Sequence, residues 1–327
     1  MPALRIAFFG TPEFAVPTLE HLLRADHPVV GIVTQPDRPR GRGQHLTAGP
    51  VKRVALDHTI PLLQPERLSD LAFLEALRSW QIDLGVVAAY GKILPQALID
   101  LPRLGMINVH ASLLPKYRGA APIQRAVMAG EPETGITIMR IVPELDAGPM
   151  FATLVRPIET NQTSEDIEAE LAVLGAALLV AVVNDIAAGR AEEIPQDAAH
   201  ATYAPRLNKS EGLIDWTRSA QSIHDGVRGL HPWPHAFTYL GGARYIILES
   251  RVEPHPSAAS GPRAARPGEL LQASGERLHV RCGDHSVLAI LQIQPEGRRP
   301  LDVREFLAGH HVQTGQVFIG AKITSAP

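Results

Sequence analysis

The sequence has little cysteine and no long uninterrupted apolar segment. Cys282 is the only cysteine among 327 residues, which excludes an intramolecular disulfide and a cysteine-rich metal site. The longest apolar stretch, 171–188, is interrupted by Asn184 and Asp185, so no segment reaches membrane-spanning length. Residues 1–5 lack the longer apolar run of a signal peptide. We therefore expect a cytoplasmic protein without a membrane partner.

The sequence also lacks a strong charge excess and a dinucleotide-binding glycine motif. The net charge is −3, with 45% hydrophobic and 20% charged residues, which is typical of a soluble globular protein. Any contact with nucleic acid must therefore come from local basic patches. Gly10 follows the first apolar run, but no further glycine stands at dinucleotide-binding spacing, so we expect no such cofactor.

What the N-terminal part does contain is a series of short apolar runs separated by helical patterns. Helical patterns cover 51–58, 69–81 and 163–188, and Gly189 ends the last of them. The predicted strands are 4–9, 29–34, 61–64, 83–91, 105–110, 135–142 and 150–157. Alternation of this kind predicts an α/β domain, with a Rossmann-like, mostly parallel sheet and flanking helices.

The composition changes in the last third of the chain. Residues 190–207 hold two prolines and no apolar period, which favours a linker between domains at 1–189 and 208–327. Beyond residue 208, short apolar runs alternate with glycine turns, the pattern of a small antiparallel β-domain. Its charge is only mildly basic, so charge alone does not identify it as a nucleic-acid-binding domain.

Three chemically useful residues lie at a strand end and in a later turn. Because Ile107 and Val109 alternate with Asn108 and His110, the two polar side chains project from one face of the strand. An ordered loop follows, and a turn further on carries Asp146. An amide and an imidazole can donate to a developing oxyanion, and a carboxylate can orient the imidazole or accept a proton. Each residue alone also fits a cap or turn, but the trio favours acyl transfer.

A basic loop follows the second predicted strand. Arg38, Arg40 and Arg42 stand at alternate positions among prolines and glycines, which excludes a helix or a central strand. Such a loop is either a solvated connector or a segment that binds phosphates.

Segments 108–115, 118–124 and 145–148 together resemble the folate-dependent formyltransferases, and the resemblance extends over nearly the whole chain. The closest match is the branch that formylates methionyl-tRNA. The resemblance implies 10-formyltetrahydrofolate as donor, the amino group of methionine on initiator methionyl-tRNA as acceptor, and a metal-independent enzyme acting as a monomer in translation initiation. One departure is Pro149, where the family pattern has an acidic residue.

The resemblance also implies roles for individual residues. Asn108, His110 and Asp146 would be catalytic, and Arg42, with Arg40 and Arg38, would contact the tRNA acceptor end. The C-terminal domain would be an OB-like barrel that binds tRNA. The folate pocket would be lined by Ser112, Leu113, Leu114, Pro115, Ala89, Tyr90, Gly91, Ile93 and Val142.

Three alternatives remain open at this point. A folate-dependent formyltransferase acting on a small amine would share the catalytic trio but would not need the basic loop or the second domain. A formyl-folate hydrolase would use the same residues with water as acceptor. A non-catalytic RNA-binding protein would need neither the trio nor a folate.

Overall fold

A computed structural model describes residues 3–40, 45–254 and 265–320. The chain divides into two compact units. The N-terminal unit comprises 1–122, 133–157 and 168–205, and the C-terminal unit comprises 123–132, 158–167 and 206–327. Two short segments that precede residue 206 therefore pack with the C-terminal part of the chain.

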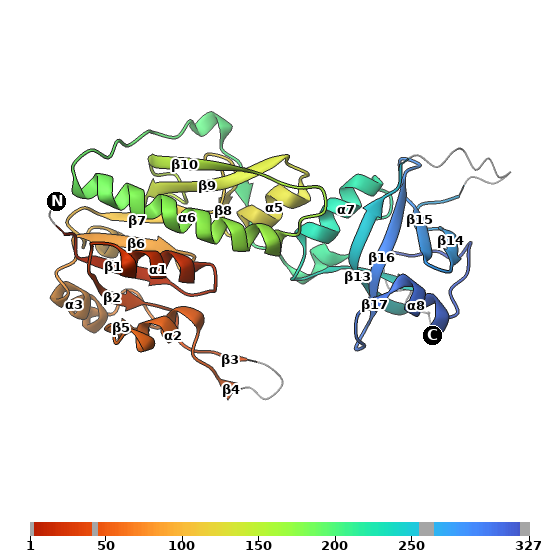
Figure 1. Ribbon diagram of the computed structural model, residues 1–327, viewed down its shortest axis with the longest axis horizontal. Helices are drawn as coiled ribbons and strands as arrows, with labels where there is room; N and C mark the ends of the chain where they lie inside the picture. Colours follow the sequence, from red (N-terminus) through yellow and green to blue (C-terminus); the bar gives the residue numbers. More distant parts are fainter. Residues whose placement is uncertain (1–2, 41–44, 255–264, 321–327) are drawn as a thin grey trace. The chain divides into compact units, whose positions relative to one another are not determined.

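The described part of the N-terminal unit contains a seven-stranded sheet in the order β10-β9-β7-β6-β1-β2-β5 (Figure 1). Strands β1, β2, β5, β6 and β7 pair in parallel, whereas β9 pairs antiparallel with both β7 and β10. The bounds are β1 Ile6–Gly10, β2 Val29–Val33, β5 Leu62–Leu63, β6 Leu84–Ala88, β7 Met106–His110, β9 Glu133–Arg140 and β10 Met150–Pro157. The predicted fold class of this part is confirmed.

Helices cover the sheet and explain its composition. The bounds are α1 Ala15–Arg24, α2 Pro50–Asp57, α3 Leu71–Ser79, α4 Gln96–Ile99 and α6 Ser164–Ala187. Strands β1 and β6 are buried at every residue, as expected of central parallel strands with both faces covered. A Cβ atom on Gly175 of α6 would lie 2.9 Å from Val109 Cγ1, so this glycine allows the helix to approach β7 closely.

The segment predicted as a linker contains regular structure of its own. A 3-10 helix covers Ala198–His200, and β11 (Tyr203–Ala204) pairs in parallel with β8 (Arg118–Gly119). A Cβ atom on Gly119, whose φ is +122°, would lie 2.8 Å from the Ala204 carbonyl oxygen. The loop that follows β7 is therefore tied to the segment that precedes residue 206.

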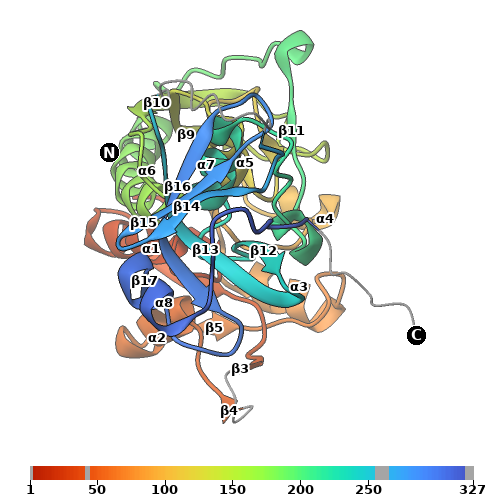
Figure 2. The ribbon, with the colours of Figure 1, turned by 90° about the vertical axis from the view of Figure 1, so that its right-hand side faces the viewer.

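The C-terminal unit is built on an antiparallel sheet, as predicted. The order is β12-β13-β16-β15-β14, and β17 pairs with β16. Helices α5 (Pro122–Met128, from Ile123 on), α7 (Ala220–Gly229) and α8 (Val303–Gly309) belong to this unit. Figure 2 shows the strands of its sheet. The strand bounds are β12 Ala236–Leu240, β13 Ala243–Val252, β14 Leu270–Ser274, β15 Arg277–Arg281, β16 Val287–Pro295 and β17 Leu301–Asp302.

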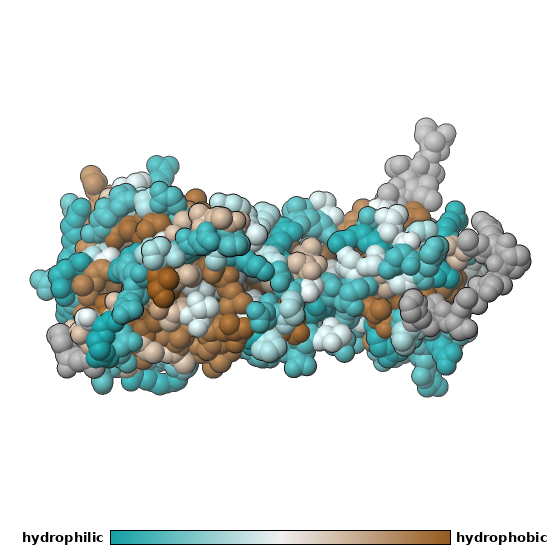
Figure 3. Space-filling model, turned by 90° about the horizontal axis from the view of Figure 1, so that it is seen from above, coloured by the Kyte–Doolittle hydropathy of each residue, from teal (hydrophilic) through white to brown (hydrophobic). Residues whose placement is uncertain are grey.

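Apolar side chains also reach the surface of the N-terminal unit, and on the face seen in Figure 3 they gather over it. Val155, Val173 and Ile194 are each more than half exposed, at 54%, 53% and 57%. No helix among the described residues is long and apolar enough to cross a membrane.

Candidate active site

The predicted site residues lie at the edge where the parallel strands end. Gly10 of β1 pairs with Ala88 of β6, and Ala88 pairs with Val109 of β7, so the three carboxyl ends are adjacent. Ligands of parallel α/β sheets lie beyond this edge. Thr11, Ala89 and His110 are therefore placed where a bound substrate is expected.

The imidazole of His110 and the carboxylate of Asp146 lie close together. His110 Nδ1 lies 3.7 Å from Asp146 Oδ2, and the two side chains are only 6% and 19% exposed. This separation is too long for a hydrogen bond, but it is short enough for electrostatic attraction between the carboxylate and a protonated ring. His110 Nε2 lies 3.0 Å from the carbonyl oxygen of Tyr117, which can only accept, so this nitrogen carries a proton.

Asn108 precedes His110 by two residues on the same face of β7. Its side chain is half-buried and makes no hydrogen bond to any residue that the structure describes. The neighbouring strands place Val87 and Met139 on either side of it. An amide held in this way can donate to a substrate oxygen without first breaking a bond to the protein.

Asp146 lies in a tight turn whose conformation is costly. Its φ is +47°, a left-handed value that residues other than glycine adopt rarely. A Cβ atom on Gly148 would lie 1.9 Å from the Arg140 carbonyl oxygen, so only glycine fits there. The backbone N–H of Gly119 donates to Asp146 Oδ2 at 2.8 Å and fixes the direction of the carboxylate.

Two residues that sequence reasoning missed hold this turn in place. Gln196 Nε2 donates to the carbonyl oxygens of Asp146 and Gly148, both at 2.8 Å. Arg118, which is 7% exposed, donates from Nε and Nη2 to Gln196 Oε1 at 3.1 and 2.7 Å. The segment expected to be a linker thus supplies a side chain that supports the acidic residue, and no local sequence pattern would have revealed it.

The loop from Ser112 to Pro115 is fixed mainly by Thr137 of β9. Thr137 Oγ1 donates to the Ser112 carbonyl oxygen at 2.8 Å and accepts from the Leu114 N–H at 3.2 Å. Ser112 Oγ donates to the Lys116 carbonyl oxygen at 2.7 Å. Ser112 and Leu114 are buried, whereas Leu113 and Pro115 are half-buried.

In the loop that follows β6, the residues predicted to line the folate pocket differ in solvent exposure. Ala89 and Gly91 are exposed with φ of +46° and +79°, and Ile93 is 83% exposed. The ring of Tyr90 is instead 2% exposed and packs edge-on against Phe9 in the core. Burial raises the pKa of Tyr90 to about 12.

The backbone of this loop is held by a polar residue from β2's end. Gln35 Nε2 donates to the Tyr90 carbonyl oxygen at 2.7 Å, and the Thr11 hydroxyl donates to the same oxygen at 3.4 Å. Val142, the remaining residue predicted to line the folate pocket, is half-buried just after β9. The predicted lining residues therefore come from two loops at the carboxyl edge of the parallel strands and from the turn after β9, whose last residue pairs with Ile107 near the start of β7.

Side-chain hydrogen bonds fix Asp37 at the start of the basic loop. Lys52 Nζ donates to Asp37 Oδ2 at 2.5 Å and Gln64 Nε2 donates to Asp37 Oδ1 at 3.0 Å. These two hydrogen bonds, with that from Lys52 dominant, lower the pKa of Asp37. Arg38 is exposed beside this cluster.

The other two predicted tRNA contacts lie further along the loop. Arg40 belongs to β3 (Pro39–Arg40), which pairs with β4 (His45–Leu46), and Arg42 lies outside the described residues. Within residues 3–40, 45–254 and 265–320, no three His, Cys, Asp or Glu side chains are grouped as metal ligands.

Comparison with known families matches both units. Residues 4–183 match the formyl transferase family, and residues 206–311 match the formyl transferase C-terminal domain. A methionyl-tRNA formyltransferase from Pelobacter propionicus is 45% identical over 98% of each chain. Those from Moorella thermoacetica and Bacillus subtilis are 44% and 41% identical, and the matches cover 96% of this chain and 99% and 97% of theirs.

Solved structures share the fold at lower identity. The N-formyltransferase from Helicobacter canadensis, in complex with folinic acid and dTDP-3-aminofucose, is 17% identical with a TM-score of 0.66, covering 89% of this chain and 99% of that one. The sugar 3N-formyl transferase WlaRD, with dTDP and 5-N-formyl-THF, gives 17% and 0.65, covering 91% and 100%.

Proposed function

Because the chain belongs to the methionyl-tRNA formyltransferase family, we propose that it transfers a formyl group from 10-formyltetrahydrofolate to the methionine amino group of initiator methionyl-tRNA. The observation that carries this proposal is the full-length match: relatives of this name correspond to both units, over 98% of each chain in one case. The sugar formyltransferases of similar fold also span 89–91% of this chain, but at 17% identity, so it is the 41–45% identity to methionyl-tRNA formyltransferases that favours tRNA over a small amine.

The geometry of the trio supplies the chemistry of the transfer. As the methionyl amine attacks the formyl carbon, the formyl oxygen gains negative charge; collapse of the tetrahedral intermediate then breaks the bond from that carbon to N10 of the folate, and N10 leaves with the proton that the amine has lost. The free amide of Asn108 donates to that oxygen, and protonated His110 stabilises it electrostatically. Asp146, 3.7 Å from the imidazole, keeps the ring oriented and takes the proton that the amine loses, directly or through one water.

The surrounding loops fit the donor and the acceptor. The exposed backbone at Ala89 and Gly91, the exposed side chain of Ile93, and Val142 form one side of the folate site, and the segment Ser112–Pro115 forms the other. We also propose that the enzyme acts as a monomer. It works in the cytoplasm, where charged tRNA is used.

The test of the function is an assay with purified protein, formyl donor and methionyl-tRNA, with formyl-methionine as the readout. The proposal expects formyl-methionine on the tRNA and no comparable transfer to small amines. Release of formate without tRNA would identify a hydrolase. Tight tRNA binding without any formyl transfer would indicate a non-catalytic RNA-binding protein.

Arg42 is our principal candidate for tRNA contact, with Arg40 and Arg38 beside it. Arg42→Ala should weaken tRNA binding and formylation, and should reduce the salt dependence of binding by about one unit of the log–log slope, as expected for one phosphate contact. Folate binding should be unchanged. Arg24→Ala, which removes an exposed arginine of α1, is the charge-matched control. Equal loss of tRNA and folate binding would point to a folding role.

A further inference from the structure

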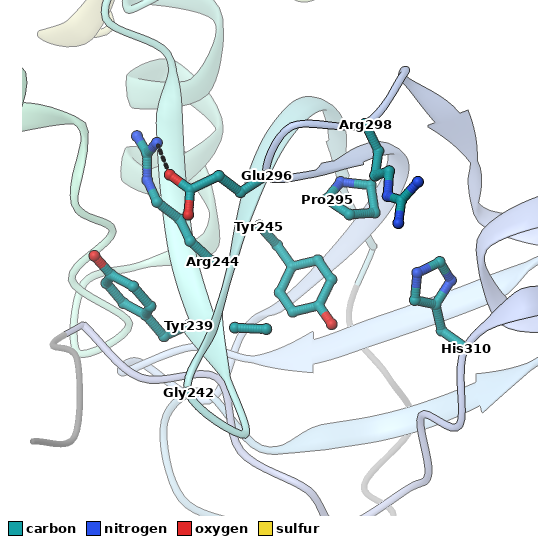
Figure 4. Close-up of a pocket in the computed structure, with 9 residues that line it drawn as sticks. Tyr239, Gly242, Arg244, Tyr245, Pro295, Glu296, Arg298 and His310 are labelled. Atoms are coloured by element: carbon teal, nitrogen blue, oxygen red, sulfur yellow. Dashed lines mark hydrogen bonds and ion pairs between the residues drawn. The ribbon is translucent and has the colours of Figure 1, made fainter. Parts of the chain in front are cut away.

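Two turns at one end of the antiparallel sheet form the sides of a hollow in the C-terminal unit (Figure 4). Tyr245 of β13 pairs with Pro295 of β16, so the turn that precedes β13 and the turn that follows β16 lie at the same end. His310, directly after α8, lines a third side. The hollow has a volume of about 390 Å³, at the lower end of the range of small-molecule sites.

The hydroxyl of Tyr245 lines this hollow and has no hydrogen-bond partner among the described residues. Tyr245 is 9% exposed, and its ring packs edge-on against Phe306 with centroids 5.5 Å apart. Its hydroxyl makes no hydrogen bond to any described residue, and Figure 4 shows it directed to the side where His310 lies. Burial raises the pKa of Tyr245, so the hydroxyl stays protonated and can donate. The hydroxyl is therefore available to donate to a ligand in the hollow.

The charges around the hollow favour an anion. Arg298 is exposed, and within the described part of the chain its guanidinium has no ion-pair or hydrogen-bond partner. The single carboxylate in the lining is that of Glu296, which Arg244 neutralises at 3.2 Å. Arg244 itself lies over the ring of Phe237 at 4.0 Å, which holds it in place. One cation is therefore left uncompensated.

His310 adds a second group that is oriented but unused. Its Nδ1 donates to the Phe306 carbonyl oxygen at 2.9 Å, and its ring stacks on Phe306 with centroids 4.5 Å apart. The carbonyl fixes the tautomer, so Nε2 is left to interact with a ligand.

We propose that this hollow binds one unpaired nucleotide through its phosphate and its base. Arg298 contacts the phosphate, the hydroxyl of Tyr245 and Nε2 of His310 bond to polar atoms of the nucleotide, and the half-exposed ring of Tyr239 stacks on the base. Cations beside aromatic rings are the usual means of binding single-stranded nucleic acid, and OB-like domains use their inter-strand turns for it. A volume of about 390 Å³ is sufficient for part of a single nucleotide.

The nucleotide has two possible sources, and the test separates them. Either it is an unstacked nucleotide of the bound tRNA, which rests on the proposed function, or it is a free nucleotide. The variants are Arg298→Ala and Tyr245→Phe, which removes only the hydroxyl. The control is Arg299→Ala: it removes the same charge from the next position, but Arg299 is paired with Glu305 at 3.2 Å and lies outside the lining. Thermal unfolding of each variant verifies folding.

The readouts are the dissociation constant of initiator methionyl-tRNA at fixed salt, and calorimetric titration with the four nucleoside monophosphates. If the source is the tRNA, Arg298→Ala and Tyr245→Phe each weaken tRNA binding on the order of tenfold, whereas Arg299→Ala changes it little. If the source is free, a nucleoside monophosphate binds the unmodified protein and is lost in Arg298→Ala, with tRNA affinity unchanged.

The inference is overturned if Arg298→Ala behaves as Arg299→Ala toward tRNA and no nucleoside monophosphate binds. Formylation by the unmodified protein is measured in parallel. If all variants still formylate tRNA, bind it with unchanged affinity and bind no nucleotide, the hollow is not a nucleotide site. The proposed function is then unaffected. If the unmodified protein does not formylate methionyl-tRNA, the proposed function is wrong. The titration with nucleoside monophosphates then still tests whether the hollow binds a nucleotide.

Discussion

At the scale of single residues, the candidate site depends on backbone positions that are costly to hold. Ala89, Tyr117 and Asp146 all have positive φ, at 46°, 61° and 47°, and all three lie in the loops around His110. Non-glycine residues keep such conformations only where the surroundings enforce them. Hydrogen bonds from Gln35 and Gln196 hold the backbone beside Ala89 and at Asp146, and the Tyr117 N–H donates to Thr202 Oγ1 at 2.9 Å.

Asn108 is the residue whose loss should affect the chemistry most directly. Asn108→Ala should lower kcat roughly a hundred- to a thousandfold, because one donor to the oxyanion is removed. Asn108→Asp keeps the shape but replaces the donor by an acceptor, so it should be equally impaired. Steady-state formylation kinetics measure both. Near-normal turnover in either variant would exclude the proposed role.

Gln196 should act as a positioning residue for Asp146. Gln196→Ala should lower kcat by about a hundredfold with a smaller change in the KM for folate, since a displacement of the carboxylate on the order of 1 Å has that effect. Gln196→Glu keeps an acceptor for Arg118 but lacks the N–H groups that bond to the Asp146 and Gly148 carbonyls, so it should not restore kcat.

Asp197→Ala is the control for Gln196, because it alters the neighbouring exposed residue, which caps the 3-10 helix. It should leave kcat near normal. Full activity of Gln196→Glu would show that Gln196 only accepts hydrogen bonds from Arg118 and does not position Asp146.

At the scale of elements, the C-terminal unit is joined to two short segments by buried polar contacts. Arg228 of α7 pairs with Asp225 at 2.8 Å and donates to the Gln162 carbonyl oxygen at 3.0 Å. His224 Nε2 lies 3.0 Å from the Thr160 carbonyl oxygen. These contacts explain why residues 158–167 pack with the C-terminal unit although α6 continues into the N-terminal one.

The pair of Arg125 on α5 with Glu211 should make stability depend on pH. Arg125 bonds to both carboxylate oxygens of Glu211, at 2.5 and 3.1 Å, and this bond is the main cause that lowers the pKa of Glu211 from its ordinary 4.5. A lowered pKa stabilises the folded state above the unfolded-state pKa, and that stability is lost as the pH falls from about 4.5 through the folded-state pKa.

Glu211→Gln should therefore flatten the decline in unfolding free energy below about pH 4.5, measured by urea titrations at several pH values. Glu276→Gln is the control, because Glu276 is 73% exposed and its pair with Arg304, at 3.4 Å, should contribute little. An unchanged acid profile in Glu211→Gln would contradict the assignment.

At the scale of the whole molecule, the boundary between the units in space differs from any single cut in the sequence. Residues 123–132 and 158–167 belong to the unit formed by 206–327. A fragment of 206–327 would lose Arg125, the partner of Glu211, and the carbonyl oxygens that accept from His224 and Arg228, although Arg228 would keep its pair with Asp225. Leaving a buried hydrogen-bonding group without a partner typically costs about 1–3 kcal/mol.

The isolated fragment 206–327 should therefore fold poorly. Near-UV circular dichroism and urea unfolding should show weak tertiary structure and low cooperativity compared with the full chain. A fragment that unfolds cooperatively with the midpoint of the C-terminal unit in the full chain would show that the two short segments are dispensable.

Much of the fold followed from local patterns. Buried strands such as β1 and β6 read as apolar runs because both faces are covered, and the Asn108–His110 spacing placed two side chains on one face because strand side chains alternate. The motifs around 108–115 and 145–148 were sufficient to indicate the family. These features depend on residues that are neighbours along the chain, so they can be predicted from the sequence.

What only the tertiary structure decided are the relations between distant segments. The 3.7 Å approach of Asp146 to His110, the support of that turn by Gln196 and Arg118, and the burial of Tyr90 depend on which strands pair and which loops meet. The same holds for the hollow around Tyr245, whose two turns are about fifty residues apart in the sequence and are brought together by the pairing of β13 with β16. Strand pairing is set by the packing of the whole sheet and leaves no signature in a local stretch of sequence.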